Sequence, residues 1–164
     1  MKQVFHGFGG KLHHDVPTWA RDDAFYHIRI RSSIEQENPL TSPDLARPLL
    51  ESVRYYETNG RWWTKLFLLM PDHLHALIAF APGETMSKVI GQWKRFHART
   101  HHVIWQEGYF DHRLRDHGVQ LDEKLDYILR NPVASGLCAK PEDWPWKYVN
   151  SDSTPETHPE QRSR

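Results

Sequence analysis

Three stretches of the chain carry the pattern of β-strands. Residues Phe25–Arg31 alternate apolar and polar side chains, which is typical of a half-buried strand. Residues Trp62–Met70 and His73–Phe80 are two nearly continuous apolar runs, separated by Pro71-Asp72, a pair that favours a tight turn. The two runs therefore predict a β-hairpin. Residues Tyr109–Arg115 predict a fourth strand.

The first predicted helix begins at Ser42-Pro43-Asp44, which offers a capping hydroxyl, a proline at the first helical position and a carboxylate near the positive end of the dipole. Asn59-Gly60 ends it. Pro48 either kinks its first turns or marks where the regular helix begins. Its apolar stripe consists of Leu45, Leu49, Val53 and Tyr56.

Two further helices are predicted after Pro82-Gly83 and from about Val119 to Arg130. Asn131-Pro132 should end the last of them, because the residue before a proline disfavours the α region. The apolar side of the second helix is Met86, Val89, Ile90 and Trp93, and its outer side carries Lys88, Gln92, Arg95 and Arg99. The core stripe of the third is Leu121, Leu125, Ile128 and Leu129.

The order of these elements predicts the fold class. Strand, helix, strand, strand, helix, strand is the βαββαβ order of a ferredoxin-like α+β sandwich, here with a further C-terminal helix that we expect to be catalytic. We expect an antiparallel sheet with helices on one face. The 164 residues suit one domain, which we place at residues 1–149. Within it residues 1–22 predict an irregular arm, and the polar residues 150–164 predict a disordered tail.

Composition narrows the class of protein. A hydrophobic content of 38%, with seven Trp and seven Phe, excludes a disordered binding segment. Cys138 is the only cysteine, so no internal disulfide can form and a reducing, cytoplasmic setting is expected. The first twenty residues lack the apolar core of a secretory signal. All apolar runs fall short of the roughly 20 residues of a membrane span, so no membrane partner is expected.

The charge is balanced overall but uneven along the chain. Lys and Arg equal Asp and Glu at 21 each, so net charge predicts no polyanionic partner. Between Met86 and Arg115, however, the basic residues outnumber the acidic ones. Such a local positive face suits a restricted surface that follows phosphates, although most amphipathic helices also present a charged face to water. The basic residues are Lys88, Lys94, Arg95, Arg99, Arg113 and Arg115.

His73 and His75 are the first candidates for chemistry. Side chains alternate faces along a strand, so the two imidazoles should point the same way and form half of a metal site. In a chain with 12 histidines the spacing alone is weak evidence, and two half-buried histidines bonded to backbone would produce the same pattern. Burying two polar rings in an aliphatic run is costly without partners, and a metal would satisfy both.

Tyr127 is the second candidate. It lies more than a third of a turn from the stripe of the third helix, on the flank of Lys124 and close in angle to Asn131. A tyrosine buried for packing would lie within the stripe. The alternative is an amphipathic tyrosine at the rim of the core with its hydroxyl in water.

Two segments of the chain, Met70–His75 and Asp126–Leu137, closely resemble the REP-associated tyrosine transposases. These are relatives of the single-strand insertion-sequence transposases in the HUH endonuclease superfamily. Pro141–Trp146 and Tyr26-His27 are also similar to that family, and the resemblance extends over residues 19–148.

The resemblance implies a role for each candidate residue. His73 and His75 would bind a divalent metal, Asn131 would complete the metal site, and Tyr127 would be the nucleophile. The implied reaction leaves a 5′-phosphotyrosine and a free 3′-hydroxyl, and reversal rejoins the DNA without ATP. An imidazole and amide set suits Mg²⁺ or Mn²⁺. The six basic residues named above and Arg130 are candidate contacts to single-stranded or hairpin DNA.

We therefore expect a metal-dependent single-strand DNA endonuclease and strand-transferase, acting as a monomer or homodimer. Two alternatives remain open. A non-catalytic single-strand nucleic-acid-binding module of ferredoxin-like fold would need neither the metal nor Tyr127. A metal-dependent hydrolase would use water as its nucleophile and form no covalent adduct.

Overall fold

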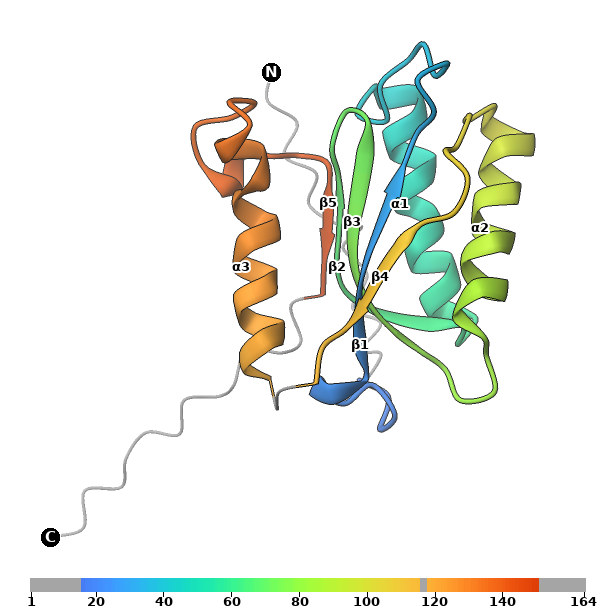
Figure 1. The fold of residues 1–164 in the computed structure, drawn as a ribbon, viewed down its shortest axis with the longest axis vertical. Helices are drawn as coiled ribbons and strands as arrows, with labels where there is room; N and C mark the ends of the chain where they lie inside the picture. The colour runs from blue at the N-terminus through green and yellow to red at the C-terminus, as the bar shows by residue number, and fades with distance from the viewer. Residues whose placement is uncertain (1–15, 116–117, 151–164) are drawn as a thin grey trace, which may run out of the picture.

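The computed structural model describes residues 16–115 and 118–150. Most of the predicted N-terminal arm, and the predicted tail beyond residue 150, therefore lie outside the described residues. The described part contains a five-stranded antiparallel sheet with the strand order β4-β1-β3-β2-β5 (Figure 1). The strands are β1 (Phe25–Arg31), β2 (Trp62–Leu69), β3 (His73–Phe80), β4 (Phe110–Arg113) and β5 (Lys147–Val149).

Helices cover both faces of this sheet. The α-helices are α1 (Pro43–Thr58), α2 (Met86–His101) and α3 (Val119–Ala134), and two short 3-10 helices span Asp22–Ala24 and Pro141–Asp143. Figure 1 shows α1 and α2 on one face and α3 alone on the other. The order β1-α1-β2-β3-α2-β4 confirms the ferredoxin-like α+β fold, with α3 as the additional helix. Within the described residues, no helix combines the length and apolar character needed to cross a bilayer.

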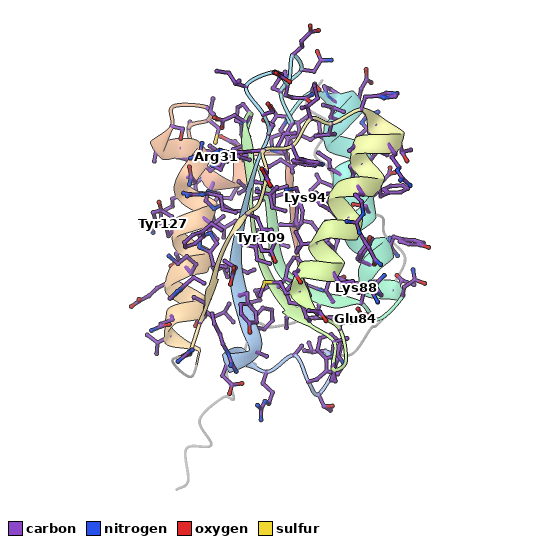
Figure 2. The ribbon with its side chains drawn as sticks, turned by 45° about the vertical axis from the view of Figure 1, so that its right-hand side comes forward. Arg31, Glu84, Lys88, Lys94, Tyr109 and Tyr127 are labelled. Atoms are coloured by element: carbon purple, nitrogen blue, oxygen red, sulfur yellow. The ribbon has the colours of Figure 1, made fainter. Side chains whose placement is uncertain are left out.

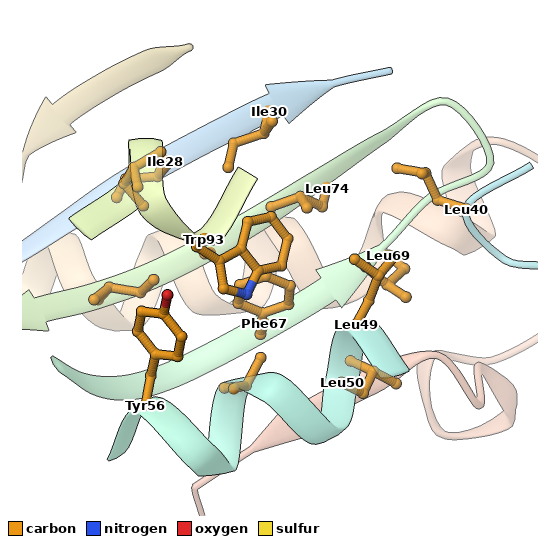
Figure 3. Packing of buried hydrophobic residues seen from close by; sticks show 14 of the residues in the cluster. Ile28, Ile30, Leu40, Leu49, Leu50, Tyr56, Phe67, Leu69, Leu74 and Trp93 are labelled. Atoms are coloured by element: carbon orange, nitrogen blue, oxygen red, sulfur yellow. The ribbon is translucent and has the colours of Figure 1, made fainter. Parts of the chain in front are cut away.

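The larger core lies between the sheet and the pair α1 and α2. Figure 3 shows Trp93 of α2 at its centre, close to Phe67 of β2, and their ring centroids are 5.5 Å apart. The indole Nε1–H of Trp93 donates to Ser52 Oγ at 2.8 Å, which satisfies the polar edge of the buried ring. The predicted stripe of α1 is buried here: Leu45, Leu49, Val53 and Tyr56.

His97 of α2 is fully buried in the same core. Its Nε2 lies 2.9 Å from Ser52 Oγ, and its Nδ1 lies 3.1 Å from Nδ1 of His101. Burial, together with the nearby His101, lowers the pKa of His97 to about 3. The imidazole is therefore neutral at neutral pH.

We expect His97 to make the fold sensitive to acid. As the pH falls below 6.5, the ordinary pKa of histidine, the unfolded chain takes up a proton that the folded chain cannot. The stabilisation is thus complete above pH 6.5 and is lost towards pH 3. Between pH 7 and pH 5 this residue should lower the free energy of unfolding by about 1–2 kcal/mol. Urea unfolding at the two pH values measures the effect.

A neutral replacement provides the control for this prediction. His97→Gln should lose that part of the pH dependence, whereas the same change at the exposed His112 should not. If His97→Gln kept the full pH dependence of the original protein, His97 would not be its source.

The sequence prediction for the end of α3 is wrong. The helix does not stop at Arg130 but continues through Asn131 and Pro132 to Ala134. A proline inside a helix removes one N–H donor and disfavours the α conformation of the residue before it. Here Pro132 is buried against the sheet side of α3, so packing outweighs the local preference. The continuation keeps Asn131 helical, one turn after Tyr127.

Three smaller features also differ from the sequence prediction. β4 is shorter than predicted, and each of its four residues is exposed. The hydroxyl of Ser42 does not cap α1 but donates to the carbonyl of Pro39 at 2.8 Å. The short strand β5 was not predicted, because three residues carry too little alternation to be recognised.

Candidate active site

The two predicted metal ligands lie on the face of the sheet that α3 covers. His73 and His75 project from β3 to the same side, as their spacing predicts, and their Nε2 atoms are 3.2 Å apart. His75 is buried, with 4% of its surface exposed, and His73 is half-buried. The two Nε2 atoms thus converge on one point beside the sheet.

Asn131 of α3 approaches the same point from the opposite side. Its amide Nδ2 lies 3.2 Å from Nε2 of His75. Because the oxygen and nitrogen of an amide are interchanged by a simple flip, the Asn131 oxygen can equally face this position. The third predicted ligand therefore meets the first two, although it comes from an element 56 residues further along the chain.

The outer nitrogen of His73 is held by its neighbour in the β2–β3 turn. Its Nδ1 lies 2.7 Å from Oδ1 of Asp72, and this hydrogen bond lowers the pKa of the Asp72 carboxyl. The carboxylate accepts the Nδ1–H, so the lone pair of neutral His73 is on Nε2, the nitrogen that faces His75. A carboxylate on the outer nitrogen is a common arrangement for metal-binding histidines.

The outer nitrogen of His75 has a second imidazole as its partner. Nε2 of His27, on β1, lies 3.0 Å from Nδ1 of His75, and the two rings are stacked with centroids 5.2 Å apart. Burial lowers the pKa of His75 to about 3 and that of His27 to about 4, with smaller contributions from nearby positive groups. Both rings are neutral at neutral pH, which is the state in which histidine binds metals.

These donors fit a divalent cation. Two imidazole nitrogens converge, an amide oxygen can reach the same point, and other coordination positions remain for substrate oxygens or water. Among the described residues no three His, Cys, Asp or Glu side chains gather at one metal-sized site.

Tyr127 lies at the rim of this site. It is one turn before Asn131 on α3, 60% of its surface is exposed, and Nζ of Lys124 lies 5.3 Å from the centre of its ring. Together with Lys124 and His112 it lines a groove of about 310 Å³ between α3 and β4. The structure thus brings His73, His75 and Asn131 together and leaves the phenol in solvent beside them.

Comparison with known proteins supports the resemblance that the sequence motifs indicate. No family model matches the chain. A curated protein of Haemophilus influenzae, named "Putative REP-associated tyrosine transposase", is 27% identical over 59% of this chain and 64% of its own length. The chain resembles the REP-associated tyrosine transposases.

A solved structure shows the same fold. The REP-associated tyrosine transposase bound to a REP hairpin superposes with a TM-score of 0.65 at 17% identity, over 81% of this chain and 80% of that one. At this identity the similarity to the solved transposase establishes the fold alone. The chain spans 64% of the length of the curated relative.

Most of the basic residues singled out in the sequence lie away from the site. Figure 2 shows Lys88 and Lys94 on α2 and Tyr127 on α3, at opposite sides of the sheet. Arg95 and Arg99 are exposed on the same helix α2.

The other predicted DNA contacts are scattered. Lys94 is engaged structurally, since its Nζ donates to the carbonyls of Gln106 and Gly108. Arg113 pairs with Tyr26 in the sheet and shares the α1 and α2 face, and Arg115 is exposed after β4. Arg130 is the exception, because it lines a surface depression together with Tyr127 and Asn131.

Sequence reasoning gave no role to His27. The segment Tyr26-His27 contributed to the family resemblance, but His27 is 48 residues from His75 and reads as one polar position of a half-buried strand. Only the pairing of β1 with β3, which sets Arg29 opposite His75 and His27 two residues away, reveals the contact. A sequence signal for such a contact would need the strand register.

Proposed function

We propose that this chain is a tyrosine-dependent DNA transposase of the HUH type that cleaves and rejoins single-stranded or hairpin DNA. The observation that carries the proposal is the convergence of His73 and His75, whose Nε2 atoms are 3.2 Å apart, with Asn131 against them and Tyr127 one helical turn away. The name of the curated relative, and the REP hairpin bound to the transposase of the same fold, support the assignment of DNA as the substrate.

His73, His75 and Asn131 would hold Mg²⁺ or Mn²⁺, which when bound polarises a phosphate and offsets the charge that develops on it. The Tyr127 oxygen attacks phosphorus and loses its proton as the new bond forms. The bond from phosphorus to the 3′-oxygen breaks, and that oxygen leaves as a hydroxyl. Rejoining is the same step in reverse, so the number of phosphodiester bonds is conserved and no nucleotide cofactor is required.

The surroundings of Tyr127 suit this role. Most of its side chain is exposed, and its ring lies next to the ammonium of Lys124. Residues four apart on a helix have Cβ atoms about 5–6 Å from each other. Rotation of the Tyr127 side chain towards Asn131 can therefore bring the phenol to a phosphate at the site while α3 stays in place.

Adduct formation tests the proposal directly. The protein is incubated with Mn²⁺ and a panel of single-stranded hairpins carrying a label at the 3′ end, because the 5′-phosphotyrosine retains the DNA on the 3′ side of the cut. A labelled protein band in a denaturing gel is the expected result. Cleavage without such a band would favour the hydrolase, and binding that is indifferent to EDTA with no cleavage would favour the non-catalytic module.

We expect His27 to act as a positioning residue for His75. When Nε2 of His75 binds a cation, its remaining proton is on Nδ1 and needs the acceptor that His27 Nε2 supplies. His27→Phe, which keeps the ring volume but no acceptor, should weaken Mn²⁺ binding about 10–100-fold. His27→Gln, which keeps an acceptor, should retain most of the affinity. The Mn²⁺ affinity of both variants is obtained from the concentration of free Mn²⁺, measured by electron paramagnetic resonance. Equal affinities of His27→Phe and His27→Gln would exclude His27 as a positioning residue.

A further inference from the structure

The sheet surface between the imidazole pair and the open edge at β4 carries two arginines and an exposed aromatic ring. Arg29 and Arg31 of β1 lie opposite His75 and His73 of β3 in the sheet register. On its other side Arg29 lies opposite Phe110 of β4. Alternation places these side chains on the α3 face, the face of the candidate site. We call Arg29, Arg31 and Phe110 the edge strip.

Phe110 is the unusual member of the edge strip. It is a large apolar residue on an edge strand, and 47% of its surface is exposed. Its ring is held by two contacts, the guanidinium of Arg29 at 5.4 Å and the His27 ring at 5.9 Å in a T-shaped arrangement. An exposed aromatic ring flanked by arginine is the composition of surfaces that stack unpaired bases.

The two arginines give the edge strip a positive charge next to His73 and His75. Arg29 lies directly opposite His75 in the sheet, and Arg31 lies directly opposite His73. Arg31 is half-exposed, and its guanidinium lies 3.9 Å from the Asp72 carboxylate, a distance too long for a strong ion pair. Asp111 of β4 pairs with Ile28 and so belongs to the other face.

We propose that the edge strip binds the single-stranded DNA next to the scissile phosphate, with Arg29 and Arg31 on backbone phosphates and Phe110 stacked on an unpaired base. The inference rests on the proposed function, because it takes the imidazole pair as the place of cleavage. The strand would cross β1 and β4 towards the open edge, beside the groove that Tyr127 and His112 line. A duplex stem does not suit the strip, since its bases are already stacked on one another.

DNA binding measured in EDTA, which removes divalent ions and so prevents cleavage, tests the edge strip. Fluorescence anisotropy compares a labelled DNA hairpin that has single-stranded overhangs with the same hairpin without them. Phe110→Leu should weaken binding of the overhang substrate about 5- to 150-fold, the equivalent of one lost stacking contact, and leave the blunt hairpin unaffected. Phe110→Trp, which keeps an aromatic ring, should retain binding of the overhang substrate. Arg29→Gln and Arg31→Gln should each reduce the slope of log affinity against log salt by about one.

Two matched controls separate the edge strip from general positive charge. Arg113→Gln removes a charge from the same strand β4 but from the opposite face, and Lys88→Gln removes one from α2. Both should leave overhang binding unchanged. If either costs as much as Arg29→Gln, or if Phe110→Leu weakens both hairpins equally, the strip is not the single-strand site. Circular dichroism verifies that each variant is folded.

The outcome is distinguishable from failure of the proposed function. If overhang binding depends on Phe110 but the unmodified protein forms no covalent adduct, the edge strip binds single-stranded DNA and the proposed transposase reaction is wrong. If Phe110→Leu and Arg29→Gln form the adduct as well as the unmodified protein and keep its overhang affinity, the edge strip is not the single-strand site, while the proposed reaction stands. Absence of binding to any hairpin by the unmodified protein would overturn the strip.

Discussion

Replacing Tyr127 with phenylalanine should abolish the covalent protein–DNA adduct and leave DNA binding intact. The change removes one oxygen atom, the proposed nucleophile, from a side chain that is 60% exposed. Since the phenol makes no packing contact that the phenylalanine ring would lose, the free energy of unfolding should stay within about 0.5 kcal/mol of the original value. A denaturing gel with 3′-labelled hairpin measures the adduct, and anisotropy measures binding.

Tyr55 provides the matched control for this prediction. It is an equally exposed tyrosine, 67% exposed, on α1 at the other face of the sheet. Tyr55→Phe should form the adduct at the original rate. An adduct from Tyr127→Phe, or its loss in Tyr55→Phe, would remove Tyr127 from the role of nucleophile.

Replacing either of the proposed metal ligands, His73 or His75, should also strongly reduce Mn²⁺-dependent cleavage. Stabilisation of a reacting phosphate by a bound cation is worth several kcal/mol, so we expect His75→Ala to reduce the cleavage rate at least a hundredfold. Titration of Mn²⁺ against the single-turnover rate measures the loss. A normal rate at any Mn²⁺ concentration would exclude His75 as a ligand.

Because His75→Ala is also expected to destabilise the fold, a second variant is needed. His75 is buried, and its removal leaves the Nε2 of His27 without a partner at a cost of about 1–3 kcal/mol. His73 is closer to the surface, so His73→Ala should lose the same activity at little cost in stability. His101→Gln changes an imidazole of α2 on the opposite face and should retain full cleavage.

The centre of the site could be predicted because it depends on local periodicity. A strand period of two places His73 and His75 on one face, and a helical period places Tyr127 outside the apolar stripe. Asn131 was placed through the family resemblance, while the local rule for proline ended the helix four residues too early, at Arg130 instead of Ala134. The error arose because burial of Pro132 is a tertiary effect that no local preference contains.

The long-range parts of the site could not be predicted. The contact between His27 and His75 depends on the register of two strands 48 residues apart. The basic residues of α2 were correctly expected to face outwards, but their sequence does not say which face of the sheet the helix covers. Arg29 and Arg31 in turn read as ordinary polar positions of a half-buried strand, and only the sheet places them beside the imidazoles.

The uninterrupted course of α3 through Pro132 has a mechanical consequence. Tyr127, which would carry the attached DNA, and Asn131, which would complete the coordination of the ion, share one continuous helix, so their backbones move together. A swing of that helix away from the sheet, with DNA attached, would withdraw the Asn131 amide at the same time. Movement of the attached DNA strand and loss of one ligand from the ion would then be coupled in a single step.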